Sequence, residues 1–308
     1  MQAQTVYHLG REFKREVPVW ASMIPGKKVL CHPQISIRKI RHMTSEIMTR
    51  NLDSADAEHI ATTTERRYNS MRKDTLHRSG CRDVWNAFMC EGARYGAYDI
   101  PSCPTTAQNF PNVIVTWEEA KSIYKRKLAS GNPNFHEDAF VCWYIDDYKF
   151  DGPRGIWHDS KFALKVLCHF AGAITPDFST YQDFPEPIKV YNTYRMRAFG
   201  YWLGKNGIPV INNVRWGTQA TYRYCFEGIP TDSIIAIGTC GGSPRKYEDR
   251  ERFEKGLHEL VKVLCPHTII VYGSASYPCF DKLIDQGIKI VSFPSQTAQA
   301  FEGRKGHE

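Results

Sequence analysis

FVCWYIDDYKFD (140–151), AGAITPDFSTY (171–181) and IPVINNVRWG (208–217) are three apolar runs that each stop abruptly at polar residues. A short apolar run of this kind, separated by a helical stretch from the next run, is typical of a βα unit. Parallel α/β folds place their sites at the carboxyl ends of the strands, where these polar residues gather. The first candidates for a functional cluster are therefore Asp146, Asp147, Asp177, Asn213, Arg215 and Trp216.

The same alternation continues to the C-terminal end of the chain. Sustained β-α alternation predicts a parallel sheet with right-handed crossovers, and strands that are apolar throughout indicate burial on both faces. The count and the length fit a (β/α) barrel, which need not be complete or regular, and a doubly wound parallel sheet is the alternative. Strands are expected at 112–117, 139–145, 172–175, 208–214, 233–238, 268–273 and 288–293, and 98–101 is a candidate for an eighth.

Composition and charge divide the chain into two parts. The first 80 residues hold 14 Lys and Arg against 8 Asp and Glu, so they carry +6 of the formal net charge of +7. We expect a basic N-terminal extension (1–80) followed by a barrel-like domain (81–308). A basic segment beside a nearly neutral body favours a polyanion partner such as nucleic acid, and the alternative is a solvated tail without a partner.

The apolar content gives no indication of a membrane or of secretion. No apolar run approaches the ~20 residues that span a bilayer, and the first residues, MQAQTVYHLG, contain no apolar signal region. We expect a cytoplasmic protein without a membrane partner, whose oligomeric state the sequence does not indicate. The ten cysteines are expected to be reduced thiols, and the spacing of Cys81, Cys90 and Cys103 lacks the Cys-x-x-Cys pair typical of zinc, so no metal or other cofactor is expected.

Several segments in order resemble an uncharacterised bacterial and phage family, the domain of unknown function numbered four-four-one-seven. The resemblance covers about Cys81 to Ser295 and implies an association with phages and mobile elements, hence a bacterial host cell, but supplies no reaction. It is carried by IDDY (145–148), ITPDFSTY (174–181), YNTYRMRAFGYW (191–202), NVRWG (213–217), FEGIP (226–230), AIGTCG (236–241) and IIVYGSA (269–275).

The candidates for acid/base or nucleophilic chemistry are three carboxylates. Asp146 and Asp147 follow one strand, and because side chains alternate along a strand, only one of the pair is expected to face the site. Asp177 follows Pro176 on a turn among aromatic residues that raise a carboxyl pKa. The alternative is that Asp177 accepts from the Ser179 or Thr180 amide in a turn, in which case Asp177→Asn should be mild for folding and activity.

The remaining candidates are expected to bind a ligand. Asn192 and Arg195 lie on the helix after Asp177, and Arg195 is expected to pair with Asp177 or to hold an anion. Asn213, Arg215 and Trp216 combine an amide, a guanidinium and an indole that can bond to and stack on a base or sugar. The glycine-rich turns after two later strands favour a phosphate-binding site, although neither the glycine signature of dinucleotide-binding folds nor the Walker motif of nucleotide-binding loops is present. These turns contribute Gly238, Thr239, Gly241, Gly273 and Ser274.

These residues favour an enzyme that acts on a nucleotide or nucleic acid by glycosyl transfer or N-glycosidic cleavage, a transferase or hydrolase chemistry in which two carboxylates flank a sugar carbon. The alternatives are a non-catalytic nucleic-acid-binding or regulatory phage protein and an inhibitor that sequesters a nucleotide. We expect Asp147, Asp177, Asn213, Arg215 and Gly238 to surround one cavity.

Overall fold

The computed structural model describes residues 5–8, 11–14, 83–239 and 247–299, and the chain divides into two units, Met1–His32 and Pro33–Glu308. In the first unit, β1 (Thr5–His8) pairs antiparallel with β2 (Arg11–Lys14). Most of the predicted basic extension, together with Cys81 and Gly241, lies outside the described residues.

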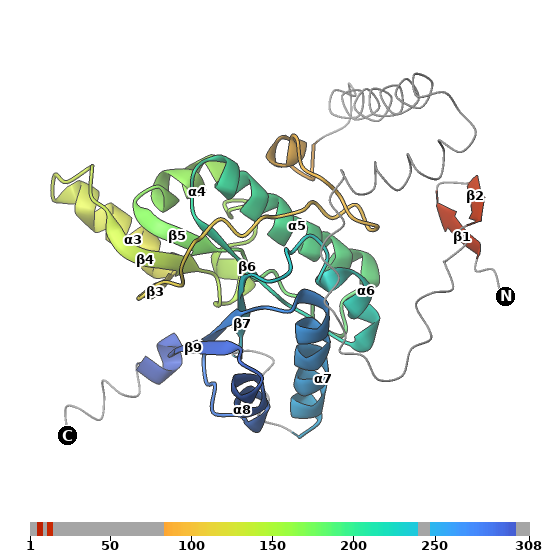
Figure 1. Ribbon diagram of the computed structural model, residues 1–308. Coiled ribbons are helices and arrows are strands. Elements are labelled where there is room, and N and C mark those ends of the chain that lie inside the picture. The colour runs from red at the N-terminus through yellow and green to blue at the C-terminus, as the bar shows by residue number, and fades with distance from the viewer. Residues whose placement is uncertain (1–4, 9–10, 15–82, 240–246, 300–308) are drawn as a thin grey trace, which may run out of the picture. The chain divides into compact units, whose positions relative to one another are not determined.

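The second unit is built on one seven-stranded parallel sheet whose strands follow their order in the chain. A doubly wound sheet reverses its strand order at a switch point, whereas a barrel winds in one direction. The uninterrupted order therefore confirms the barrel-like prediction and excludes the doubly wound alternative (Figure 1). The strands are β3 (Ile114–Thr116), β4 (Glu137–Cys142), β5 (Phe170–Ile174), β6 (Val210–Asn213), β7 (Ile234–Gly238), β8 (Thr268–Tyr272) and β9 (Lys289–Phe293).

The sheet is a curled half-barrel, and its first and last strands approach each other at their carboxyl ends. The Gln296 side chain, just after β9, donates to the Thr116 hydroxyl at the end of β3 over 2.9 Å. The suggested eighth strand at 98–101 is wrong, since Tyr95 and Pro101 form only an isolated bridge. Pro101 and the left-handed Asp99 (φ 56°) turn this segment instead of extending it.

Helices connect the strands and cover one face of the sheet. Two apolar clusters combine strand and helix side chains, whereas the cluster on the other face, which includes Phe140, Ile211 and Tyr272, contains no helical residue. The connecting elements are η2 (Ala87–Cys90), α3 (Trp117–Ala129), η3 (Asp147–Lys149), α4 (Ser160–Leu167), α5 (Glu186–Lys205), η4 (Gln219–Thr221), α6 (Tyr222–Cys225), α7 (Tyr247–Leu264) and α8 (Pro278–Asp285).

Local sequence signals explain where the helices begin and which side they bury. Thr116 and Glu119 form a reciprocal capping box that starts α3 directly at the end of β3. In α7, Phe253, Leu257 and Leu260 are buried at helical spacing. No helix in the described part of the chain is long and apolar enough to cross a membrane.

The cysteines differ from the prediction at one position. Six of those that the structure describes are reduced thiols, but Cys265, after α7, is disulfide-bonded, because pairing depends on spatial proximity that sequence spacing does not reveal. The reduced thiols are Cys90, Cys103, Cys142, Cys168, Cys225 and Cys279.

Candidate functional site

A buried ion pair lies at the carboxyl ends of β5 and β6. The Arg215 Nη1 donates to the Asp177 Oδ2 over 2.7 Å, and the Asn213 Nδ2 donates to the other carboxylate oxygen over 2.9 Å. The Tyr144 hydroxyl in turn donates to the Asn213 Oδ1 over 3.0 Å. The charge of Asp177 is the main cause that raises the pKa of Arg215. The structure thus brings three of the sequence candidates into direct contact.

Asp147 lies beside this ion pair and is held by the loop after β5. Its carboxylate accepts from the Ser179 amide over 3.0 Å and from the Ser179 hydroxyl over 2.8 Å. Burial is the main cause that raises the pKa of Asp147, and the nearby Asp177 charge acts in the same direction, against the Ser179 hydrogen bonds and Arg215. The Ser179 amide therefore donates to Asp147. In the turn that the sequence offered as an alternative, it would have donated to Asp177.

The neighbouring carboxylate, Asp146, does not take part in this cluster. Its side chain is 67% exposed and lies 3.7 Å from the Lys149 ammonium group. One member of the Asp146–Asp147 pair faces the site and the other faces solvent, but β4 already ends at Cys142 and the pair lies at the start of η3, so the strand alternation expected from the sequence is not the cause.

Arg195 and Asn192 of α5 form a separate network. Arg195, which the sequence led us to expect beside Asp177 or on an anion, instead donates from Nη1 to both Asp151 oxygens, over 2.9 and 2.8 Å. Its guanidinium also donates to Asn192 over 2.7 Å and lies 3.8 Å from the Phe178 ring centre. Asn192 donates to the Ser179 carbonyl, so this network supports the loop that holds Asp147.

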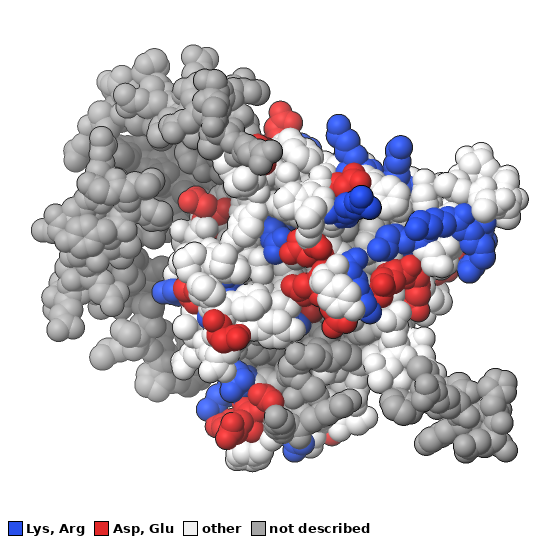
Figure 2. Space-filling view, turned by 180° about the vertical axis from the view of Figure 1, so that it is seen from behind, with Lys and Arg blue, Asp and Glu red and all other residues white. Residues whose placement is uncertain are grey.

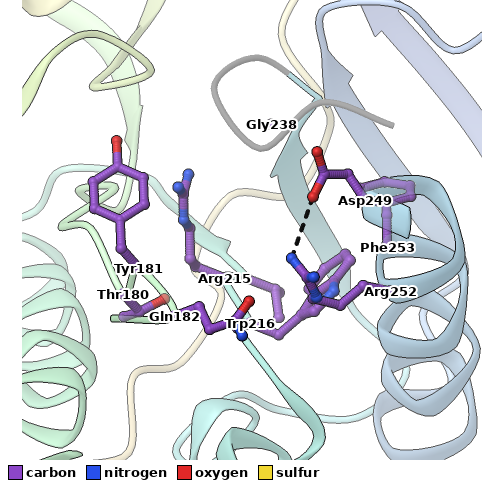
Figure 3. Close-up of a pocket in the computed structure, with 11 residues that line it drawn as sticks. Thr180, Tyr181, Gln182, Arg215, Trp216, Gly238, Asp249, Arg252 and Phe253 are labelled. Carbon is purple, nitrogen blue, oxygen red and sulfur yellow. Dashed lines mark hydrogen bonds and ion pairs between the residues drawn. The ribbon is translucent and has the colours of Figure 1, made fainter. Parts of the chain in front are cut away.

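A pocket of about 130 Å³ opens beside the ion pair, between the ends of β5, β6 and β7 and the start of α7 (Figure 3). Of the five residues expected around one cavity, Arg215 and Gly238 line it, whereas Asp147, Asp177 and Asn213 do not. The lining consists of Thr180, Tyr181, Gln182, Val214, Arg215, Trp216, Gly217, Gly238, Asp249, Arg252 and Phe253.

Trp216 also lines the pocket, but part of its ring is used in packing. The ring lies 5.2 Å from that of Phe253, and a Cβ added to Gly256 would overlap the indole nitrogen. Gly256 therefore provides the space on α7 that positions Trp216.

The glycine-rich turns hold the strand ends together. A Cβ at Gly238 would meet the Tyr144 ring at 2.8 Å, so this glycine is needed for close approach. The Thr239 hydroxyl donates to the Ser274 carbonyl over 3.0 Å, and the Gly273 amide donates to the Phe293 carbonyl over 2.8 Å. Among the described turn residues, only Gly238 reaches the pocket.

Residues of the site that were not singled out from the sequence include Tyr144, Asp249 and Arg252. Asp249 and Arg252 form an ion pair at 3.2 Å in the first turns of α7. Their position just after a glycine-rich strand end was the available signal, since a helix that follows such a turn begins at the edge that carries the site. Across the described ranges, no group of three His, Cys, Asp or Glu is placed to hold a metal ion.

Comparisons with known proteins give phage relatives whose names state no activity. The "Gene 1 protein" of Mycobacterium phage D29 is 31% identical over 182 residues, which are 59% of this chain and 62% of that protein. The "Gene 1 protein" of Mycobacterium phage L5 is 31% identical over 177 residues, 58% of this chain and 72% of that protein. The chain thus spans less than two thirds of the D29 relative. No solved structure matches. The model of one family covers residues 93–294, so the chain belongs to the family described as Domain of unknown function (DUF4417).

Proposed function

We propose that the chain is an enzyme of a phage or mobile element that cleaves or transfers a glycosidic bond of a nucleotide or nucleic acid in the cytoplasm of the bacterial host. The observation that supports it is the pair of neighbouring carboxyl groups with contrasting surroundings. Asp147 is desolvated and has a raised pKa, while Asp177 is bound by a guanidinium. Two carboxyl groups whose environments differ in this way are typical of an acid/base division of labour.

The contrasting environments suggest a role for each carboxyl group. The raised pKa of Asp147 favours its protonated form, which donates a proton to the leaving base as the bond to the sugar carbon breaks and its electron pair goes to the base. Asp177 is in ionic contact with Arg215, and its negative charge stabilises the positive charge that develops on the sugar. Water then adds to the sugar carbon and returns a proton to the Asp147 carboxylate.

The test is release of a free base, detected by mass spectrometry after incubation with nucleosides, nucleotides and single-stranded nucleic acid. Asp147→Asn should lower the rate by ~10²-fold or more, because an amide cannot donate this proton. Asp146→Asn is the matched control, since it removes the same charge from the adjacent, exposed position and should leave the rate within about twofold. Equal activity of the Asp147→Asn and wild-type proteins would refute the proposal, as would the absence of base release from every substrate.

A non-catalytic protein that binds nucleic acid, or sequesters a nucleotide, is the second candidate. It is favoured by the basic composition of residues 1–80 and by the fact that both Asp177 oxygens already accept hydrogen bonds within the protein. If the chain is such a protein, the Asp177–Arg215 ion pair stabilises the fold and has no catalytic role. Nucleic-acid binding without any base release would support it.

A further inference from the structure

The pocket beside Arg215 is too small for a whole nucleotide. It encloses about 130 Å³, whereas sites that enclose a drug-sized ligand have roughly 300–1,000 Å³. The pocket therefore fits one part of a nucleotide, either a base or a phosphate group. The two differ in charge and shape, so the lining can distinguish them.

The charges of the lining favour an uncharged group. Each of the two guanidinium groups already has a carboxylate partner: Asp177 for Arg215 at 2.7 Å, and Asp249 for Arg252 at 3.2 Å. A phosphate would bring further negative charge to cations that are already neutralised. On the face shown in Figure 2, acidic and basic side chains likewise lie beside each other.

The shape of the lining favours a planar ring. Tyr181 and Arg215 lie along one side of the pocket, and Asp249 and Arg252 lie along the other (Figure 3). An aromatic ring and a guanidinium plane are both surfaces on which a base stacks. Tyr181 is 47% exposed, so its ring is accessible for such a contact.

The opposite side offers a hydrogen-bond donor and an acceptor next to each other. In the Asp249–Arg252 pair one Arg252 nitrogen bonds one Asp249 oxygen, and the side chains are 37% and 41% exposed. An exposed pair of this kind contributes little to stability, so a ligand replaces it at little cost. The edge of a base presents N–H donors beside oxygen or nitrogen acceptors, which match a carboxylate and a guanidinium.

A buried hydroxyl provides an independent indication of a missing partner. Thr180 lines the pocket, and its Oγ1 has no hydrogen-bond partner among the residues that the structure describes. Buried hydroxyl groups are normally bonded. Rotation of this side chain toward a polar ligand would supply the bond.

The geometry points to a nucleobase as the group that this pocket holds, with its face on Tyr181 and Arg215 and its edge on Asp249 and Arg252. The inference rests on the proposed function, and it identifies the leaving base as the part of the substrate that is recognised. Phosphates of the substrate lie outside the pocket.

Calorimetric titration of the full-length protein tests the inference, with guanosine, adenosine, cytidine and uridine in one set and inorganic phosphate and ribose 5-phosphate in the other. At least one nucleoside should bind, and neither phosphate compound should displace it. Arg252→Gln should lower the affinity for that nucleoside tenfold or more, which corresponds to about 1.4 kcal/mol of binding free energy. Lys255→Gln is the matched control, because it removes the same charge and another intrahelical ion pair from α7 outside the pocket, and should change affinity less than twofold.

A second variant distinguishes a loss of nucleoside binding from a loss of folding. Thr180→Val replaces the unpaired hydroxyl by a methyl group, so it should weaken nucleoside binding without lowering the melting temperature. Failure of all four nucleosides to bind, displacement by phosphate, or unchanged affinity of the Arg252→Gln protein would each overturn the inference.

The same measurements separate this inference from the proposed function. Nucleoside binding by the wild-type and Asp147→Asn proteins without any base release would leave the base pocket standing and reject the glycosidic reaction. Base release with an unchanged KM in the Arg252→Gln protein would support the reaction and reject the pocket.

Discussion

Replacement of Asp177 by Asn should destabilise the protein, although the two side chains have nearly the same shape. The Asn213 amide can still donate to the remaining oxygen of Asn, but the new NH₂ group faces the Arg215 guanidinium, so two donors oppose each other. The Arg215 charge is then left in a site where only 17% of its side chain is exposed. The structure therefore changes the expectation of a mild effect on folding.

The size of the loss follows from burial. Removing one partner of a fully buried ion pair costs about 3–5 kcal/mol. The Asp177 and Arg215 side chains keep 10% and 17% exposure, so the lower part of this range, discounted for contact with water, is appropriate. We expect Asp177→Asn to reduce the free energy of unfolding by about 2–3 kcal/mol.

A double-mutant cycle isolates the pair. Asp177→Asn, Arg215→Gln and the double variant are compared by urea denaturation, followed by tryptophan fluorescence. In the double variant the amides of Asn and Gln can bond to each other and no charge is left alone, so its loss should be close to that of one single variant. The coupling free energy should then be about 2 kcal/mol. Additive losses, with coupling below about 0.5 kcal/mol, would refute the view that the two side chains form one buried unit.

Three further outcomes are expected. Because the pKa of Asp147 is raised in the folded state, its stabilising contribution is present below the ordinary carboxyl pKa of about 3.9 and is lost as pH rises through the raised value. In urea denaturation from pH 3 to 8, the free energy of unfolding of Asp147→Asn should therefore rise relative to that of the wild type as pH increases. A difference that stays constant with pH would contradict this expectation. Gly256→Ala should lower the free energy of unfolding by about 1–3 kcal/mol, because the added methyl group clashes with Trp216. Gly204→Ala, whose nearest neighbour would be at 3.5 Å, should raise it by up to about 1 kcal/mol. Equal melting temperatures of the two variants would count against the clash. If residues 1–80 bind nucleic acid, replacing Lys27, Lys28, Arg66 and Arg67 by Gln should reduce the salt dependence of binding. The slope of log K against log salt concentration should fall by about 0.9 for each phosphate that the protein no longer neutralises. An unchanged slope would place the binding surface elsewhere.

The sheet could be predicted strand by strand because its signals are local. β5, β6 and β7, for example, are short apolar runs that end at a polar or glycine residue, and α7 has buried positions at helical spacing. The incomplete closure was less accessible to such reasoning. It depends on whether 98–101 joins the sheet, and this segment instead forms an isolated bridge at Pro101.

The candidate site was predictable to the level of strand ends but not of partners. Position after a strand placed Asp147, Asp177 and Arg215 together, and they interact. The partners themselves were not predictable: Arg195, expected on Asp177 or an anion, binds Asp151, and the Ser179 amide, named only in the alternative for Asp177, donates to Asp147. The choice between Asp151 and Asp177 for Arg195 depends on distances between loops that no sequence period encodes.

The partner assignment also bears on which carboxyl group can act as an acid. In the structure the Ser179 amide and hydroxyl donate to Asp147, whose burial outweighs these bonds and raises its pKa, while Arg215 forms an ion pair with Asp177. The raised pKa therefore falls on Asp147, which favours this residue over Asp177 as the proton donor of the proposed reaction.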